Sequence, residues 1–262
     1  MTLYVDDWGI NVISIIIVIL GGIGFIVMAD LIEYPQTRKL SLHSKVVLTA
    51  SGILLLLGSI VIYIFEFSNI RTLGPLSWDS KILASLFQSV SLRSAGANTI
   101  DISALREGTQ FFMIILMFIG AAPGSTGGGI KITTFAILVG AVVSMIRGKE
   151  DVVMFRYRLP KDSIYKATTI AMMGVFVVII ATMILSMTQD HHFLMLLFET
   201  VSAFGTVGLS MGLTTDLTTS GKILIVIMMF LGRLGALTLA YALQPNSKKE
   251  LYRHPEGKIT IG

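Results

Sequence analysis

The 262-residue chain is too apolar for an ordinary soluble domain, because 53% of its residues are hydrophobic, only 14% are charged, and its mean hydropathy is +0.80. Its net charge of +4 is small, and the absence of cysteine excludes disulfides and thiolate metal sites. These values predict a membrane protein.

Five apolar segments are long enough to cross a hydrocarbon core of about 30 Å, which takes about 20 helical residues. They cover roughly residues 10–32, 46–66, 109–146, 164–188 and 220–243. Two further apolar stretches, 79–92 and 193–204, are too short to cross. We expect these two to be re-entrant pore helices, with helices lying on the membrane surface as the alternative. The predicted fold class is an all-α polytopic membrane protein with five membrane spans.

The distribution of basic residues predicts the orientation. Thirteen of the 20 Lys and Arg residues fall in the connections 33–45, 147–166 and 244–262, and five fall on the opposite side. By the positive-inside rule, the N-terminus of this chain is outside the cell and its C-terminus is cytoplasmic. Topology therefore accounts for the positive charge, and we predict a cell-membrane location and no nucleic-acid partner.

The chain contains an internal repeat. The hexamer LFQSVS at 86–91 recurs as LFETVS at 197–202, within the two short apolar stretches. A glycine-bearing turn follows each hexamer, SAGA at 94–97 and TVGL at 206–209. The repeated unit is therefore a span, a short helix, a glycine-bearing turn and a second span.

The glycine spacing extends the repeat. Gly96 and Gly208 each precede another glycine, Gly120 and Gly232, by 24 residues, and Gly21 aligns with these later two. The turn glycine belonging with Gly21 would fall before the first residue, so we expect a C-terminal fragment that lacks the N-terminal repeats of its parent chain. The expected organisation is the second half of an incomplete repeat at 1–33, a complete repeat at 34–146, a cytoplasmic linker at 147–162, a complete repeat at 163–243, and a cytoplasmic tail at 244–262.

The two glycine-bearing turns predict a cation pathway. Backbone that leaves a helix at membrane depth is tolerated where it is buried in protein or lines a water-filled cavity. Rings of backbone carbonyls replace the hydration shell of potassium in selective pores, and glycine permits the required backbone angles. The alternative is that the two glycines only end interfacial helices. The predicted filter residues, which form the only expected metal site, are Ser94, Ala95, Gly96, Ala97, Thr206, Val207, Gly208 and Leu209.

The third predicted span is too long to be one helix. Its 38 residues would extend about 57 Å at 1.5 Å per residue, nearly twice the hydrocarbon thickness. A break in the glycine-rich part leaves a half-helix on each side and a loop facing the pore, which makes the loop a candidate gate. The predicted gating loop consists of Ala121, Ala122, Pro123, Gly124, Ser125, Thr126, Gly127, Gly128, Gly129, Ile130 and Lys131.

A phosphate-binding loop is the competing interpretation of this segment. The motif needs a glycine followed directly by lysine and then by serine or threonine, after a strand. Here Ile130 separates Gly129 from Lys131, Ile132 follows the lysine, and no strand is predicted before the loop. The sequence therefore argues against nucleotide binding at this loop.

Arg233 is the predicted partner of the gate. The repeat places it opposite Ala121, and a cation inside an apolar span is functional or paired by default. Its guanidinium could donate to freed carbonyls of residues 121–131 and add positive charge that opposes a cation. A purely structural clamp between helix and loop is the alternative.

Three segments together resemble a known family. SLRSAGANTID, GAAPGSTGGGIKITTF and FETVSAFGTVGLSMG are similar to the third filter loop, broken inner helix and fourth filter loop of the Trk/Ktr/HKT potassium transporters, in particular the membrane subunits of bacterial Ktr uptake systems. The resemblance implies a pore of four span, pore-loop, span units that conducts potassium, with sodium as an alternative ion. It also implies a gating role for the broken segment, a homodimer, and a regulatory ring of cytoplasmic nucleotide-binding subunits.

Two other functional classes lack the residues they need. No Asp, Glu or His lies well inside any predicted span, which argues against a proton relay, and no cluster of nucleophiles, acids or metal ligands indicates an enzyme. We therefore predict no enzymatic activity and no bound cofactor, so a nucleotide would act only through a partner subunit. A structural or regulatory membrane subunit, a non-conducting fragment and a membrane enzyme with a glycine-rich loop remain the alternatives. The basic segments 147–162 and 244–262 suit either anionic membrane lipid or a regulatory subunit.

Overall fold

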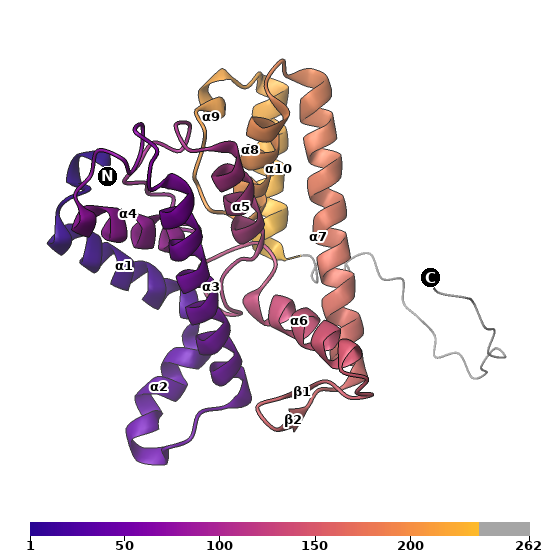
Figure 1. The fold of residues 1–262 in the computed structure, drawn as a ribbon. Helices are drawn as coiled ribbons and strands as arrows, with labels where there is room; N and C mark the ends of the chain where they lie inside the picture. Colours follow the sequence, from indigo (N-terminus) through magenta and orange to yellow (C-terminus); the bar gives the residue numbers. More distant parts are fainter. Residues whose placement is uncertain (236–262) are drawn as a thin grey trace.

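The computed structural model describes residues 1–235, which form a helical bundle with one short hairpin (Figure 1). The prediction of a helical fold is confirmed apart from this hairpin of two-residue strands. The predicted tail at 244–262 lies outside the described residues. In chain order the elements are η1 Thr2–Tyr4, α1 Trp8–Ile23, α2 Phe25–Thr37, α3 Leu42–Glu66, α4 Trp78–Ser91, α5 Glu107–Phe118, α6 Ile132–Ile146, β1 Val153–Met154, β2 Tyr157–Arg158, α7 Lys161–Thr188, α8 Phe193–Phe204, α9 Leu213–Asp216 and α10 Thr219–Leu234.

The helices fall on the predicted apolar segments. Within residues 1–235, α3 and α7 are each long and apolar enough to cross a membrane, and α1 with α2 would make a third span. The segment 109–146 is divided into α5 and α6, of 12 and 15 residues. Helix α10 covers the described part of the last predicted span. The total of five spans stays a prediction.

The segment 10–32 differs from the single span that we expected. Helices α1 and α2 meet at a bend of 101°. Gly24 forms the junction with φ +81°, and a Cβ at this position would lie only 2.5 Å from the Pro123 carbonyl oxygen. The bend therefore needs a glycine, because any side chain here would be strained and would collide with backbone.

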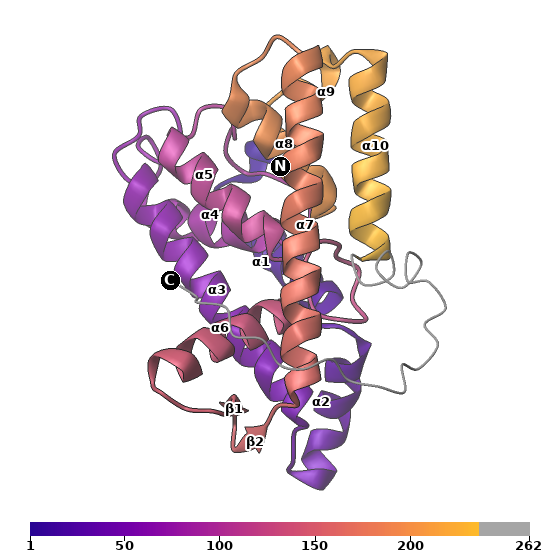
Figure 2. The same cartoon turned by 90° about the vertical axis from the view of Figure 1, so that its right-hand side faces the viewer.

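The bundle has two distinct ends. Figures 1 and 2 both place the end of α2, the starts of α3 and α7, and the β1–β2 hairpin at one end of the molecule. The end of α3, the end of α7 and helix α9 lie at the other. The basic connections between α2 and α3 and between α6 and α7 therefore share one end, which is the arrangement that the positive-inside rule requires.

The two short helices are enclosed by longer ones. Helix α4 contacts α3 and α1, and α8 contacts α5, α7 and α10. A main hydrophobic core joins both repeats, and the Phe118 ring of α5 stacks on the Phe204 ring of α8 at 5.8 Å between centroids. With 14 and 12 residues, the helices extend about 21 and 18 Å. They end inside the bundle and deliver the next residues to its interior.

Candidate ion pathway and gate

The two predicted filter segments have the same backbone pattern. Ser94 and Gly96 have positive φ values of 68° and 67°, and Thr206 and Gly208 have values of 51° and 87°. Each segment thus has left-handed backbone at its first and third residues. A serine and a threonine rarely adopt this conformation, so finding it at both aligned positions indicates a constrained shape that the repeat preserves.

The first three carbonyls of each segment are unbound. Within residues 1–235, no hydrogen-bond donor reaches the carbonyl oxygens of 94–96 or 206–208. Gly96 and Gly208 are exposed, and Ser94, Ala95 and Thr206 are partly exposed, so water or an ion can reach this backbone. Six partially negative oxygens are therefore free to replace water around a cation.

The fourth carbonyl of each segment is held by the pore helix before it. The Ser91 hydroxyl donates to the Ala97 carbonyl, and the Ser202 hydroxyl donates to the Leu209 carbonyl, the latter at 2.6 Å. Neither serine was among the site residues predicted from the sequence. Their signal was present, because both end the repeated hexamers.

The two filter segments lie against each other. The Ser94 hydroxyl donates to the Gly205 carbonyl at 3.1 Å and lies 3.4 Å from the Thr206 hydroxyl. A Cβ on Gly96 would lie 3.0 Å from the Val207 carbonyl oxygen. Glycine at this position therefore permits the left-handed turn and also the close approach of the second segment.

The predicted gating loop is non-helical and closed at its base. Helix α5 ends at Phe118, and its carbonyl accepts from the Ile130 N–H at 3.2 Å, while the Gly120 N–H donates to the Ile130 carbonyl at 2.8 Å. Gly120 has no room for a side chain, because a Cβ would lie 1.8 Å from the Gly128 carbonyl oxygen. Residues 121–129 therefore form a compact loop between two half-helices.

The bend between α1 and α2 holds one side of this loop. The Ala122 N–H donates to the Gly22 carbonyl at 3.0 Å, and the Thr126 N–H donates to the Gly21 carbonyl at 3.2 Å. In return, the Phe25 N–H donates to the Gly124 carbonyl at 3.2 Å. The bend between α1 and α2 thus supplies two acceptors and one donor to a loop about 100 residues further along the chain.

The filter and the end of α10 hold the other side. The Gly128 N–H donates to the Thr206 hydroxyl at 2.8 Å, and the Gly129 N–H donates to the Gly232 carbonyl at 3.2 Å. The Arg233 guanidinium donates to the Thr126 carbonyl. The structure therefore brings the loop, the predicted filter segment 206–209 and Arg233 together.

Two cations bind adjacent carbonyls of the loop. Besides Arg233 on Thr126, the Lys131 ammonium donates to the Gly127 carbonyl at 2.5 Å. Within residues 1–235, the ion pair found is Arg158 with Asp151, so neither loop cation has a carboxylate partner. Two positive charges without an acidic partner in the described residues thus lie on the loop that contacts the predicted filter residue Thr206.

The contacts of the loop also bear on the phosphate-loop alternative. A phosphate cradle needs several backbone N–H groups free to face an anion. Six N–H groups in this loop already donate to the protein, those of Ala122, Ser125, Thr126, Gly128, Gly129 and Ile130. The glycines serve close packing of backbone on backbone.

Two buried carboxylates, one in each complete sequence repeat, each accept several hydrogen bonds. Glu199 of α8 accepts from the hydroxyls of Ser210, at 2.8 Å, and Thr214, beyond the fourth filter segment. Glu66, at the end of α3 and fully buried, accepts from the Arg106 N–H at 3.0 Å. The further donors to Glu66 are the side chains of Asn69, Thr72 and Thr109. Sequence reasoning missed Glu66, because a carboxylate at a span end gives no sign of distant donors.

Comparison with known proteins places these features in a family. A model of the TrkH cation transport proteins matches residues 1–250. Ktr system potassium uptake protein B of Bacillus subtilis is 40% identical over 99% of this chain and 58% of its own length. Potassium/sodium uptake protein NtpJ of Enterococcus hirae is 34% identical over 100% of this chain and 59% of its own length. The names of these relatives describe transport proteins, as expected for a chain predicted to lack enzymatic activity.

A solved structure has the same fold. The potassium transporter TrkH from Vibrio parahaemolyticus matches with a TM-score of 0.70 at 19% identity, over 92% of this chain and 53% of that chain. This likeness shows the arrangement of helices alone. The chain spans somewhat more than half the length of the relatives it matches.

Proposed function

The chain belongs to the TrkH family of cation transport proteins, and we propose that it forms part of a channel-like pore for uptake of a monovalent cation across the cell membrane. Potassium is the proposed ion, with sodium as the alternative, because the relatives' names include both potassium and potassium/sodium uptake proteins. The carrying observation is the pair of filter segments that share left-handed backbone at equivalent positions and leave six carbonyls unbound.

The proposed mechanism uses these carbonyls in place of water. A dehydrated cation needs several oxygen ligands, and uncharged carbonyls bind it without trapping it. Two filter segments form two sides of a ring, so we propose that preceding repeats of a longer chain supply the other two. This fits the coverage of the relatives, of which this chain spans 58 to 59%.

We further propose that residues 121–131 gate the pore. The loop is tied to the fourth filter segment, to the α1–α2 bend and to α10, so a movement of these helices would move the loop. Arg233 and Lys131 would oppose a cation while the loop is in place. We also propose that the protein is a homodimer and that a ring of nucleotide-binding subunits binds its basic end. The N-terminus of this chain is proposed to lie outside the cell and its C-terminus in the cytoplasm.

Growth of a potassium-uptake-deficient strain at low potassium tests the function. The full-length protein is expected to restore growth, whereas Gly208→Ser is expected to abolish it, because φ +87° at this residue is strained for any side chain. Gly52→Ser is the matched control, since nothing lies within 4 Å of a Cβ on this helical glycine. Equal rescue by Gly208→Ser would refute the filter, and no rescue by the unmodified protein would refute potassium uptake.

A further inference from the structure

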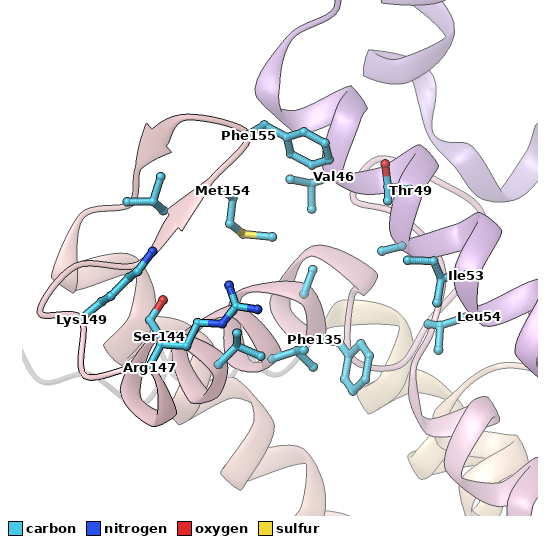
Figure 3. A pocket seen from close by; sticks show the side chains of 16 residues that line it. Val46, Thr49, Ile53, Leu54, Phe135, Ser144, Arg147, Lys149, Met154 and Phe155 are labelled. Atoms are coloured by element: carbon cyan, nitrogen blue, oxygen red, sulfur yellow. The ribbon is translucent and has the colours of Figure 1, made fainter.

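An apolar groove with a basic rim lies at the end of the bundle that carries the basic connections. It has a volume of about 400 Å³, within the usual range for small-ligand sites. Helices α3 and α6 and the β1–β2 hairpin form its walls (Figure 3). None of the residues described so far as filter, loop or anchor lines it, so it is separate from the proposed ion pathway.

The walls of the groove are hydrocarbon. Ile53 on α3 and Val139 on α6 are 57% and 44% exposed, so the groove is open along its side. Gly140 of α6 faces the start of the hairpin, since a Cβ there would be in van der Waals contact with the Val152 and Met154 side chains. The groove therefore suits an extended apolar chain that enters from the membrane.

The rim of the groove is cationic. Arg147 follows the last residue of α6, and Lys149 lies two residues further on. Figure 3 shows the Arg147 guanidinium pointing into the cavity toward Met154, with Lys149 at its edge. Among the described residues that line the groove none is acidic, and the nearby Asp151 is held by Arg158 at 2.9 Å. Within residues 1–235, neither rim cation has a hydrogen-bonded or ionic side-chain partner.

We propose that this groove binds one anionic phospholipid, with an acyl chain along α3 and α6 and its phosphate at Arg147 and Lys149. Basic pockets between membrane helices on the cytoplasmic side bind anionic headgroups, and each basic residue near such a headgroup strengthens binding about fivefold. A soluble anion would not require the apolar walls, and an apolar protein segment would not require two unpaired cations. The combination of both features on the basic end fits an anionic lipid.

Native mass spectrometry of the purified full-length protein tests the headgroup. Phosphatidylglycerol and phosphatidylcholine with the same acyl chains are the probes, and the tightest bound molecule is followed. We expect phosphatidylglycerol to bind more tightly, and Arg147→Gln with Lys149→Gln to weaken it about thirtyfold. The matched control is Lys161→Gln with Lys166→Gln, which removes the same charge from exposed positions outside the groove. Equal affinity for the two lipids, or equal loss in the control, would overturn the proposal.

A second pair of variants tests the acyl chain. Val139→Trp should fill the groove and weaken phosphatidylglycerol, whereas Val142→Trp, on an exposed residue outside the lining, should not. Loss of binding in the charge variant but not in Val139→Trp would mean that the rim binds an anion without a lipid chain, and would overturn the lipid. A photoreactive residue at Val139 should cross-link to phosphatidylglycerol. Cross-linking to another part of the protein or to a second copy would show that protein covers the groove, and would also overturn the lipid proposal.

Discussion

Single residues decide the chemistry beside the proposed filter. Arg233 and Lys131 each donate to a carbonyl of the loop, and neither has an acidic partner within residues 1–235. Two unit charges 4 Å apart interact with about 1 kcal/mol in water and about 4 kcal/mol near a protein surface. A cation that passes the loop would meet repulsion of this order.

Replacement of Arg233 tests this barrier. If Arg233 contributes at least about 1 kcal/mol of repulsion, Arg233→Ala should raise cation flux about fivefold or more, as measured by rubidium uptake into proteoliposomes. Lys222→Ala is the control, because it removes a charge from the opposite end of the same helix. Unchanged or lower flux, together with a lower melting temperature, would identify Arg233 as a structural clamp instead.

The serines that end the two short helices allow a test of whether single hydroxyl groups position the proposed filter. Ser202→Ala removes the hydroxyl that holds the Leu209 carbonyl at 2.6 Å, a bond that contributes about 1 kcal/mol. We expect the preference for potassium over sodium to fall about fivefold while uptake persists. Ser59→Ala removes a similar bond, to the Leu55 carbonyl at 2.8 Å, far from the filter. If both variants keep the original selectivity, Ser202 does not position the filter.

Among the secondary-structure elements, two helix breaks and one helix end meet at one place. The α1–α2 bend, the α5–α6 loop and the end of α10 exchange backbone hydrogen bonds through Gly21, Gly22 and Gly232. Two of these glycines, Gly21 and Gly232, align in the sequence repeat with Gly120 at the loop entry. Close backbone approach explains the two later aligned glycines, because a Cβ on Gly120 or Gly232 would lie 1.8 Å from a carbonyl oxygen, whereas a Cβ on Gly21 would make an ordinary contact of 3.4 Å with the Thr126 hydroxyl.

Gly24 tests whether the bend supports the loop. Gly24→Ala places a Cβ 2.5 Å from the Pro123 carbonyl oxygen at φ +81°, and strain of this kind costs about 1–3 kcal/mol. We expect the loop to shift, which should raise its cleavage by added protease and alter basal flux. Gly52→Ala, with open space around its Cβ, should change neither. If the two variants behave identically, the bend at Gly24 does not support the proposed gating loop.

For the whole molecule, the placement of the basic connections at one end predicts the orientation in the membrane. The chain lacks cysteine, so a single introduced cysteine in an otherwise cysteine-free protein reports which side it faces. Leu3→Cys should react with an impermeant maleimide on intact cells, and Lys161→Cys only after permeabilisation. Both positions are exposed. The reverse pattern would contradict the proposed orientation, with an outer N-terminus and the basic connections in the cytoplasm.

The sequence predicted the helical segments, the break at 121–131 and the equivalence of residues 94–97 and 206–209 in the repeat, which have the same backbone pattern. The helical segments follow from hydrophobic length, because the membrane thickness determines how many apolar residues a span requires. The break follows because a 38-residue segment is too long to cross the membrane as one helix. The equivalence of the two turns follows from aligning the two copies of the repeat. These are local or periodic properties, which do not depend on knowing the fold.

The tertiary structure alone decided the bend at Gly24, the four donors to Glu66, the serine anchors of the filter and the groove between α3 and α6. Each depends on atoms from segments distant in the sequence. Gly24 resembles any other helical glycine until the Pro123 carbonyl lies against it, and Arg147 is one basic residue among many until the fold directs it into a groove. Close approach and burial arise only when the helices pack together, so no pattern within one segment predicts them.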